Sequence, residues 1–137
     1  MKTVEHDGDR YLLVKRSGES SLVRDPETGV ERYLPNDEIE ITGTSGLETA
    51  AEVIPNPQRR LLTAVRDERT LGLLVELERS GPISVRELLG RYDLCESDLH
   101  GISAELRAAG LLEEATVAGE RGYRTTELAS RALEVLR

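Results

Sequence analysis

The sequence contains no phenylalanine and no tryptophan, and four tyrosines supply all of its aromatic side chains. With 38% hydrophobic residues, the chain still has enough apolar surface for a packed interior, so wholesale disorder is not expected. The core must therefore consist mainly of leucine, valine, isoleucine and alanine. A length of 137 residues leaves room for one ordinary domain or for two small domains that share a core.

Cysteine and long apolar runs are scarce as well. Cys95 is the single cysteine, so no internal disulfide can form. No apolar run approaches the roughly 18 residues that a membrane-spanning helix requires, and residues 1–7 lack the apolar stretch of a secretion signal. We therefore expect a cytoplasmic protein with no membrane partner.

Lysine is the third scarce residue. Only Lys2 and Lys15 are lysines, so arginine supplies the other 16 of the 18 basic residues, against 26 carboxylates. The net charge of −8 argues against a nucleic-acid partner, because contacts to phosphates dominate such affinity. An acidic chain that is poor in lysine but retains arginine resembles, however, the proteins of salt-loving archaea, where acidity extends over the whole proteome. The alternative interpretation is an acidic surface that meets a basic protein.

The charge is unevenly distributed along the chain. Residues 1–55 carry 6 basic and 12 acidic side chains, whereas residues 56–137 carry 12 basic and 14 acidic side chains. The second part is therefore nearly neutral, and the acidity is concentrated in the first part. A protein partner, if there is one, is expected to bind through the acidic N-terminal segment.

The first forty residues favour an antiparallel β-meander of three or four strands. Strand-forming residues cover 10–16, 21–24 and 30–34, and the alternation at 38–41 indicates one more short strand. Residues 25–29 (Asp-Pro-Glu-Thr-Gly) predict a hairpin, because proline suits the first corner of a type I turn and glycine provides the positive φ of a following bulge. A sheet of this size needs a helical layer or a second copy to pack against.

A change in composition marks the end of this segment. Residues 43–46 (Gly-Thr-Ser-Gly) are the expected junction, which makes residues 1–46 a β-meander domain. Residues 47–68 are expected to hold connecting helices, the first of them ended by Pro55. In the second, Asn56 is a suitable cap and Pro57 fits the first helical position, where its missing N–H would go unused.

Residues 69–137 carry the most ordered set of helix signals. Thr70 is expected to cap a first helix that ends before a Ser-Gly-Pro turn. Ser84 and Glu87 have the spacing of a capping box at the start of a second, short helix. Thr126 is expected to cap the last helix of the chain.

The third helix of this half, at about 96–109, has one apolar stripe. Leu99, Ile102 and Leu106 follow one another at spacings of three and four, which predicts that they are buried together. Gly110 is placed to end the helix in the left-handed conformation. Two short strands follow at about 112–125, with a turn at residues 118–122.

Three segments of this half resemble transcriptional regulators of the MarR and ArsR types. Residues 105–112 (ELRAAGLL) are similar to the end of a recognition helix and the entry into its β-wing. Residues 123–129 (YRTTELA) resemble the close of that wing, and residues 83–88 (ISVREL) resemble the start of the second helix. The resemblance covers residues 69–137 and implies a winged helix-turn-helix domain, an α+β fold for the whole chain, and regulation of transcription through double-stranded DNA. The hairpin at residues 25–29 resembles those of uncharacterised haloarchaeal proteins.

A helix of this kind can enter the major groove and present its non-buried side to base edges. Five residues of the third helix are expected to point outward: Ser97, His100, Gly101, Ala104 and Arg107. Two residues of the wing, Arg121 at the tip and Arg124 nearby, are candidates for a minor groove or a phosphate. Further phosphate contacts are expected from Arg59, Arg60 and Arg86.

Acidic residues in and near the third helix keep an alternative function open. Glu96, Asp98 and Glu105 lie on the same helix and would repel phosphates, although acidic residues also suit a helix N-terminus. The rival hypothesis is therefore a winged helix used as a non-enzymatic adaptor for protein contact. Arg121 and Arg124 could equally pair with Glu120 or Glu127.

A homodimer is expected, because most regulators read a two-fold DNA site. The N-terminal sheet and the helix that starts at Pro57 are the expected dimer surfaces. In a cytoplasm of molar salt, counterion release would supply little of the binding energy. Base contacts, DNA shape and bridging water would then matter more, and rising salt should weaken binding less than it does for basic regulators.

Catalysis has little support in the sequence. Two histidines, one cysteine and the lack of a glycine-rich phosphate loop leave few ways to build an active site. Cys95 and His100 are close in sequence, but ArsR-type metal sensors usually offer two neighbouring cysteines. We therefore expect no catalytic residue, no metal and no cofactor, and we expect Cys95 to be a small core residue.

Overall fold

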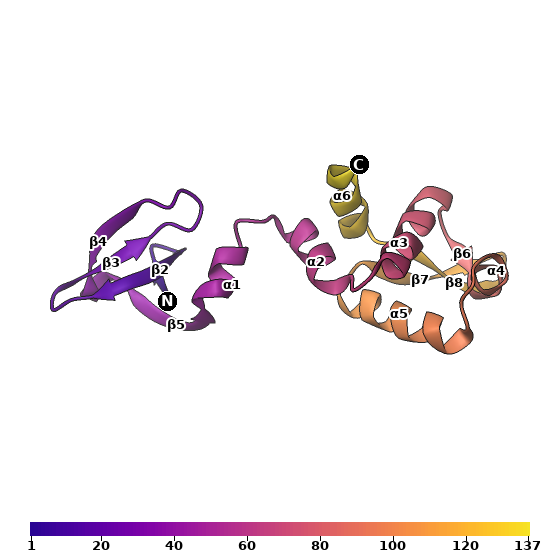
Figure 1. The fold of residues 1–137 in the computed structure, drawn as a ribbon, viewed down its shortest axis with the longest axis horizontal. Coiled ribbons are helices and arrows are strands. Elements are labelled where there is room, and N and C mark those ends of the chain that lie inside the picture. The colour runs from indigo at the N-terminus through magenta and orange to yellow at the C-terminus, as the bar shows by residue number, and fades with distance from the viewer. The chain divides into compact units, whose positions relative to one another are not determined.

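The computed structural model describes residues 1–137 and has an α+β fold. The chain divides into two compact units, Met1–Pro55 and Asn56–Arg137 (Figure 1). The boundary differs from the expected junction at residues 43–46, because residues 43–45 continue a strand and Gly46 begins a helix. Of the two helices expected to connect the domains, the first belongs to the first unit and the second belongs to the second unit.

The first unit is a five-stranded antiparallel sheet with one short helix. The strands are paired in the order β4-β3-β2-β1-β5. The elements are β1 (Lys2–His6), β2 (Asp9–Arg16), β3 (Ser20–Arg24), β4 (Glu31–Pro35), the one-turn helix η1 (Asn36–Glu38), β5 (Glu40–Ser45) and α1 (Gly46–Ala51).

The expectation of three or four strands missed β1. Val4 is the only apolar residue between Lys2 and His6, so the segment lacks a local strand pattern. Its conformation depends on long-range pairing, in which Val4 lies opposite Tyr11 of β2 and Ile41 of β5. The hairpin between β3 and β4 is confirmed, and its Gly29 has a φ of 75°.

The first unit has a small core on one face of its sheet. Val4, Val23 and Leu34 are buried there. On the other face, the hydroxyl of Thr3 lies 2.6 Å from the hydroxyl of Thr49 in α1. The helix and the sheet therefore pack together as one unit.

The second unit combines five helices with a three-stranded antiparallel sheet of order β6-β8-β7. The helix order expected for residues 69–137 is present, and β6 is an additional strand that pairs with β8. The elements are α2 (Asn56–Ala64), α3 (Glu68–Ser80), β6 (Ile83–Ser84), α4 (Val85–Arg91), α5 (Glu96–Ala108), β7 (Leu112–Val117), β8 (Glu120–Thr125) and α6 (Glu127–Leu136).

Side-chain caps fix most of the helix starts in this unit. Ser84 and Thr126 accept hydrogen bonds from backbone N–H groups three residues on, as expected. The capping box expected at Ser84 is only half formed, because the Glu87 carboxylate contacts Arg91 instead of the Ser84 N–H. Thr70 was expected to cap α3, but the cap is Asp67, whose carboxylate accepts the N–H and the hydroxyl of Thr70, each at 2.8 Å. A carboxylate is the stronger acceptor because it is charged. Hydrogen bonds from the Thr70 backbone and hydroxyl lower the pKa of Asp67 below its ordinary value.

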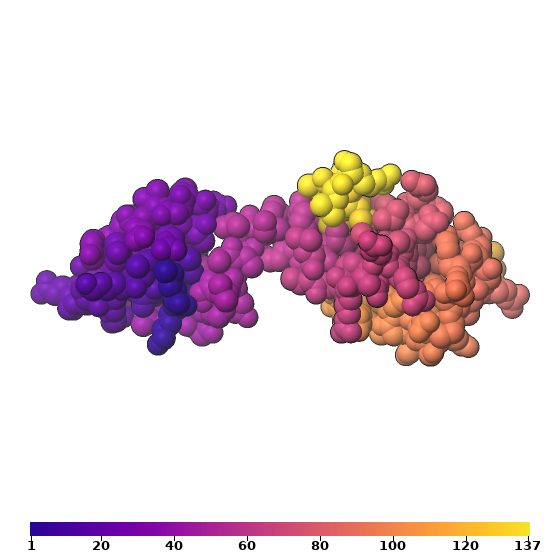
Figure 2. Space-filling view, in the orientation of Figure 1, coloured from indigo at the N-terminus to yellow at the C-terminus, as the bar shows by residue number.

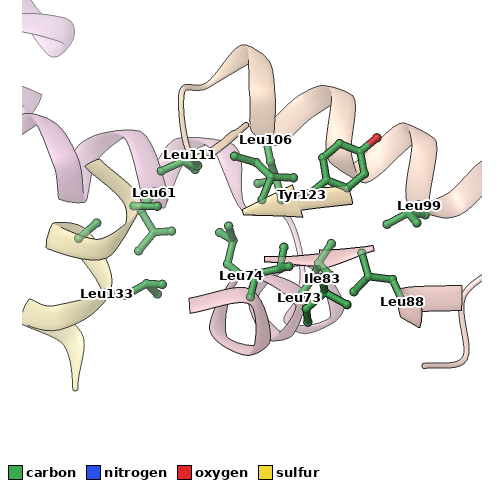
Figure 3. Packing of buried hydrophobic residues seen from close by; sticks show 14 residues of the cluster. Leu61, Leu73, Leu74, Ile83, Leu88, Leu99, Leu106, Leu111, Tyr123 and Leu133 are labelled. Carbon is green, nitrogen blue, oxygen red and sulfur yellow. The ribbon is translucent and has the colours of Figure 1, made fainter. Parts of the chain in front are cut away.

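The core of the second unit is built mainly from leucine. Figure 3 shows these side chains converging from the helices and the sheet. Leu74, Leu88, Leu106 and Leu111 are completely buried, and Tyr123 is the one aromatic residue of the cluster. The expectation of a core made of aliphatic residues is confirmed for this unit.

Shortening a core leucine on α5 tests this packing. Leu106→Ala should lower the free energy of unfolding by about 2–5 kcal/mol, because it removes apolar contacts and leaves a cavity. The matched control is Leu62→Ala on α2, because Leu62 is 64% exposed and its truncation should change stability by less than about 0.5 kcal/mol. Denaturant unfolding followed by circular dichroism measures both. Equal losses in the two variants would contradict the packing described here.

Candidate nucleic-acid interface

Helix α5 has a buried side and an exposed side. Leu99 and Leu106 are 2% and 0% exposed and attach the helix to the core (Figure 3). Ile102, expected to complete the stripe, is only half-buried, and Ser103 is buried instead. At about 3.6 residues per turn, Ile102 and Ser103 lie equally far from the direction of Leu99 and Leu106, on opposite sides of it. Ser103 is on the side covered by Tyr123 of the β7–β8 hairpin, which explains its burial.

The five residues expected to point outward from α5 are all exposed. The crest of the helix, opposite the buried side, consists of small uncharged residues. In the space-filling view the atoms of α5 (orange) lie at the surface of their unit (Figure 2). We define the crest by these four exposed residues: Ser97, Gly101, Ala104 and Ala108.

One flank of α5 faces the β7–β8 hairpin. Arg107 points to this flank, where it pairs with a carboxylate of β7. His100 lies on the same flank, beside a hollow between α5, α4 and β8. The hollow is lined by Val85, Glu96, Ser97, Leu99, His100, Arg121 and Tyr123.

Tyr123 links the hairpin to α5. Its ring is buried, and its hydroxyl lies 3.3 Å from the hydroxyl of Ser103. Arg121 donates a hydrogen bond of 3.2 Å to the same hydroxyl, and its guanidinium lies 5.9 Å from the ring centroid. Figure 3 shows the Tyr123 ring directed from β8 toward α5. The helix and the hairpin therefore keep a fixed relative position within the second unit.

Arg121 and Arg124 do not lie together as expected. The turn is confined to Ala118 and Gly119, both with positive φ, so residues 120–122 belong to β8 and Arg121 is not at the tip. Because side chains alternate along a strand, Arg121 shares the α5-facing side with Tyr123, whereas Arg124 points to the opposite side.

Carboxylates of the hairpin neutralise both of these arginines. Arg121 pairs with Glu114 at 3.2 Å, and Arg124 pairs with Glu113 at 2.7 Å. Both arginines therefore pair with carboxylates, as the alternative interpretation expected, but the partners are Glu114 and Glu113 and not Glu120 or Glu127. Such exposed pairs are weak, at about 0–1 kcal/mol each, so another anion can displace them.

The other three arginine candidates have different surroundings. Arg86 is highly exposed and pairs with Glu120 at the start of β8, 3.4 Å away. Arg60 donates to the carbonyl oxygen of Ala109 at 3.2 Å and thereby stabilises the end of α5. Arg59 is half-buried on α2. The structure therefore brings Arg86 to the hairpin, but it gives Arg60 a structural contact.

Sequence reasoning missed two arginines on the other flank of α5. Arg66 pairs with Glu105 at 3.2 Å, and Arg69 pairs with Asp98 at 3.6 Å. Hydrogen bonding to Cys95, and after it the charge of Arg69, lowers the pKa of Asp98. No local pattern could have revealed these pairs, because the partners are 39 and 29 positions apart. Two of the three acidic residues on α5 are thus held beside arginines, away from the crest.

Cys95 caps α5, and Ser97 lies within the first turn of the helix. The Cys95 sulfur accepts the N–H of Asp98 at 3.4 Å and lies 3.2 Å from the hydroxyl of Ser97. Cys95 is exposed, so the expectation of a core residue is wrong too. A cap position needs an acceptor at the surface, which explains this exposure.

These observations define an α+β protein whose second unit exposes a helix beside an arginine-bearing hairpin. No three histidine, cysteine, aspartate or glutamate side chains come together as metal ligands. None of the helices has the length and apolar character needed to cross a bilayer. The chain belongs to a family of unknown function, DUF7346, whose model matches residues 1–137. Neither the curated proteins nor the solved structures contain a significant match to it.

The Cys95 cap can be tested by exchanging its acceptor atom. Cys95→Ser should raise the free energy of unfolding by about 0.5–1 kcal/mol, because a hydroxyl is a better N-cap than a thiol. Cys95→Ala should lower it, because no acceptor remains for the Asp98 N–H. Thermal unfolding of the two variants and the parent protein under reducing conditions measures both changes. If serine and alanine shift stability equally, Cys95 does not act as a cap.

Proposed function

We propose that the chain is a DNA-binding transcriptional regulator in which residues 69–137 form a winged helix-turn-helix domain. In this proposal α5 is the recognition helix and the β7–β8 hairpin is the wing. The single observation that carries it is the arrangement around α5, where a small uncharged crest is bordered on both flanks by arginines. The expected similarity to MarR- and ArsR-type regulators belongs to the same proposal.

The crest suits close approach to base pairs. A helix with its side chains is about 10–12 Å across and the major groove is about 12 Å wide, so bulky groups on the crest would hold the helix away. Gly101 and Ala104 present almost no side chain. Ser97 and His100 are then the exposed side chains of α5 without a formal charge that can hydrogen-bond base edges.

Arginines on both flanks of α5 support the proposal. A helix in the major groove has one DNA strand on each side. Arg66 and Arg69 border one flank of α5, and Arg107 and Arg121 border the other. Contacts from both flanks would fix the position of the helix, while the crest reads the sequence.

The carboxylates beside these arginines do not exclude this role. Phosphate oxygens bind guanidinium groups as carboxylates do, often through two hydrogen bonds. The ion pairs at Arg107 and Arg121 are exposed and weak, so phosphates can replace the carboxylates. Glu96 is the one acidic residue of α5 on the hairpin flank, and it lines the hollow beside His100.

The proposal also includes a homodimer and a cytoplasmic location. A homodimer would present two copies of α5 to half-sites one helical turn apart. We propose a cytoplasmic protein of a halophilic archaeon that acts without a cofactor. Bound at a promoter, such a protein changes the access of the transcription machinery.

A protein-binding role is the second candidate function. The first unit has twice as many acidic as basic side chains, and Tyr33 of β4 is 59% exposed on its sheet. An acidic surface with an exposed aromatic ring favours a basic protein partner. Both functions can coexist, because the two surfaces belong to different units of the chain.

Charge reversal on one side of the hairpin tests the DNA proposal. Arg121→Glu should weaken retention of duplex DNA at low salt by about ten-fold or more, because a phosphate contact becomes a repulsion. Arg124 points away from α5, so Arg124→Glu should weaken the retention of DNA less than Arg121→Glu does. Electrophoretic mobility shift with a pool of random-sequence duplexes measures the retention.

The matched control is Arg131→Glu on α6. Arg131 is also paired with a carboxylate, Glu127 at 2.8 Å, so the change in net charge and the loss of an ion pair are the same. If Arg121→Glu and Arg131→Glu weaken DNA retention equally, the change in net charge alone explains the loss. That result would rule out the β7–β8 hairpin as a DNA-binding element.

A further inference from the structure

Glu114 is shared by two arginines of the proposed interface. One oxygen of its carboxylate, Oε1, lies 3.4 Å from Nη1 of Arg107 and 3.2 Å from Nη2 of Arg121. Glu114 lies opposite Tyr123 in the β7–β8 ladder, so its side chain is on the face of the hairpin that faces α5. One carboxylate therefore forms ion pairs both with the end of α5, through Arg107, and with β8, through Arg121.

This position makes Glu114 a rival of any phosphate that approaches. Each of these contacts is an ion pair through one guanidinium nitrogen, and a guanidinium has other N–H groups to offer. A phosphate that binds Arg107 or Arg121 closely must still displace Glu114, because two negative charges beside one guanidinium repel each other. Because the side chain of Glu114 is about half exposed, the freed carboxylate becomes hydrated and attracts a cation.

We propose that Glu114 competes with DNA phosphates for Arg107 and Arg121 and thereby makes DNA binding less dependent on salt. The inference rests on the proposed function, since it assigns a regulating residue to the same interface. Each phosphate contact releases about 0.9 of a cation from B-DNA. The freed Glu114 takes up at most one cation, so part of the release is cancelled.

The competition has a definite dependence on ionic strength. At low salt, Glu114 attracts the arginines and repels phosphates most strongly, so it weakens binding most. At 1 M salt the screening length falls to about 3 Å, and both effects fade. Binding by the parent protein should then fall less steeply with rising salt than binding by an arginine site without the carboxylate.

The test is Glu114→Gln, which keeps the shape of the side chain and removes its charge. The probe is a labelled pool of random-sequence duplexes of about 30 base pairs, which suits an interaction dominated by phosphates. Binding is measured by fluorescence anisotropy from about 0.05 M to 1 M salt. Thermal unfolding verifies that the variant is folded, as expected for an exposed residue.

The matched control is Glu127→Gln on α6, which breaks the ion pair with Arg131 and changes the net charge equally. Glu113→Gln is a second control, because it releases only Arg124 on the opposite face of the hairpin.

We expect Glu114→Gln to raise affinity at 0.05 M salt by about three- to ten-fold and to steepen the slope of log K against log salt by up to about 1. The curves should converge near 1 M salt. The same slope in Glu114→Gln and Glu127→Gln, with clear binding by the parent protein, overturns the inference but leaves the proposed function intact. If neither the parent protein nor Glu114→Gln binds at any salt, the proposed function itself fails.

Discussion

The burial of Leu99 and Leu106 is the constraint on which the rest of the second unit depends. Once these two side chains face the core, helical geometry fixes the direction of every other residue of α5. The crest then points to solvent, and the two flanks meet the hairpin on one side and Arg66 and Arg69 on the other. Tyr123 adds a second attachment through its contact with Ser103, so the hairpin keeps its place beside the helix.

Local signals were sufficient to predict part of this arrangement. The caps at Ser84 and Thr126, the left-handed Gly110 and the exposed side of α5 follow from side-chain chemistry within a few residues. β1, β6 and the partners of the arginines could not be predicted, because each depends on residues far away in the chain. Arg121 and Arg124 show the limit well, since only the strand boundary reveals that they point to opposite faces.

The net charge of the chain says little about its proposed interface. Nearly every arginine around α5 lies beside a carboxylate, so the local surface is close to neutral although its composition includes several cations. Such paired arginines are compatible with DNA, because exposed ion pairs are weak and phosphates accept the same hydrogen bonds. In the proposal, a site of this kind would lose less affinity with rising ionic strength than the site of a strongly basic protein.

The most direct measurement is nuclear magnetic resonance of the full chain, labelled with ¹⁵N and titrated with duplex DNA. Our account predicts that amide shifts change along residues 96–108 of α5 and residues 116–122 of the hairpin, with the first unit nearly unaffected. Shift changes confined to residues 1–55, or none at concentrations that saturate non-specific binding, would contradict the claim that the exposed side of α5 meets DNA.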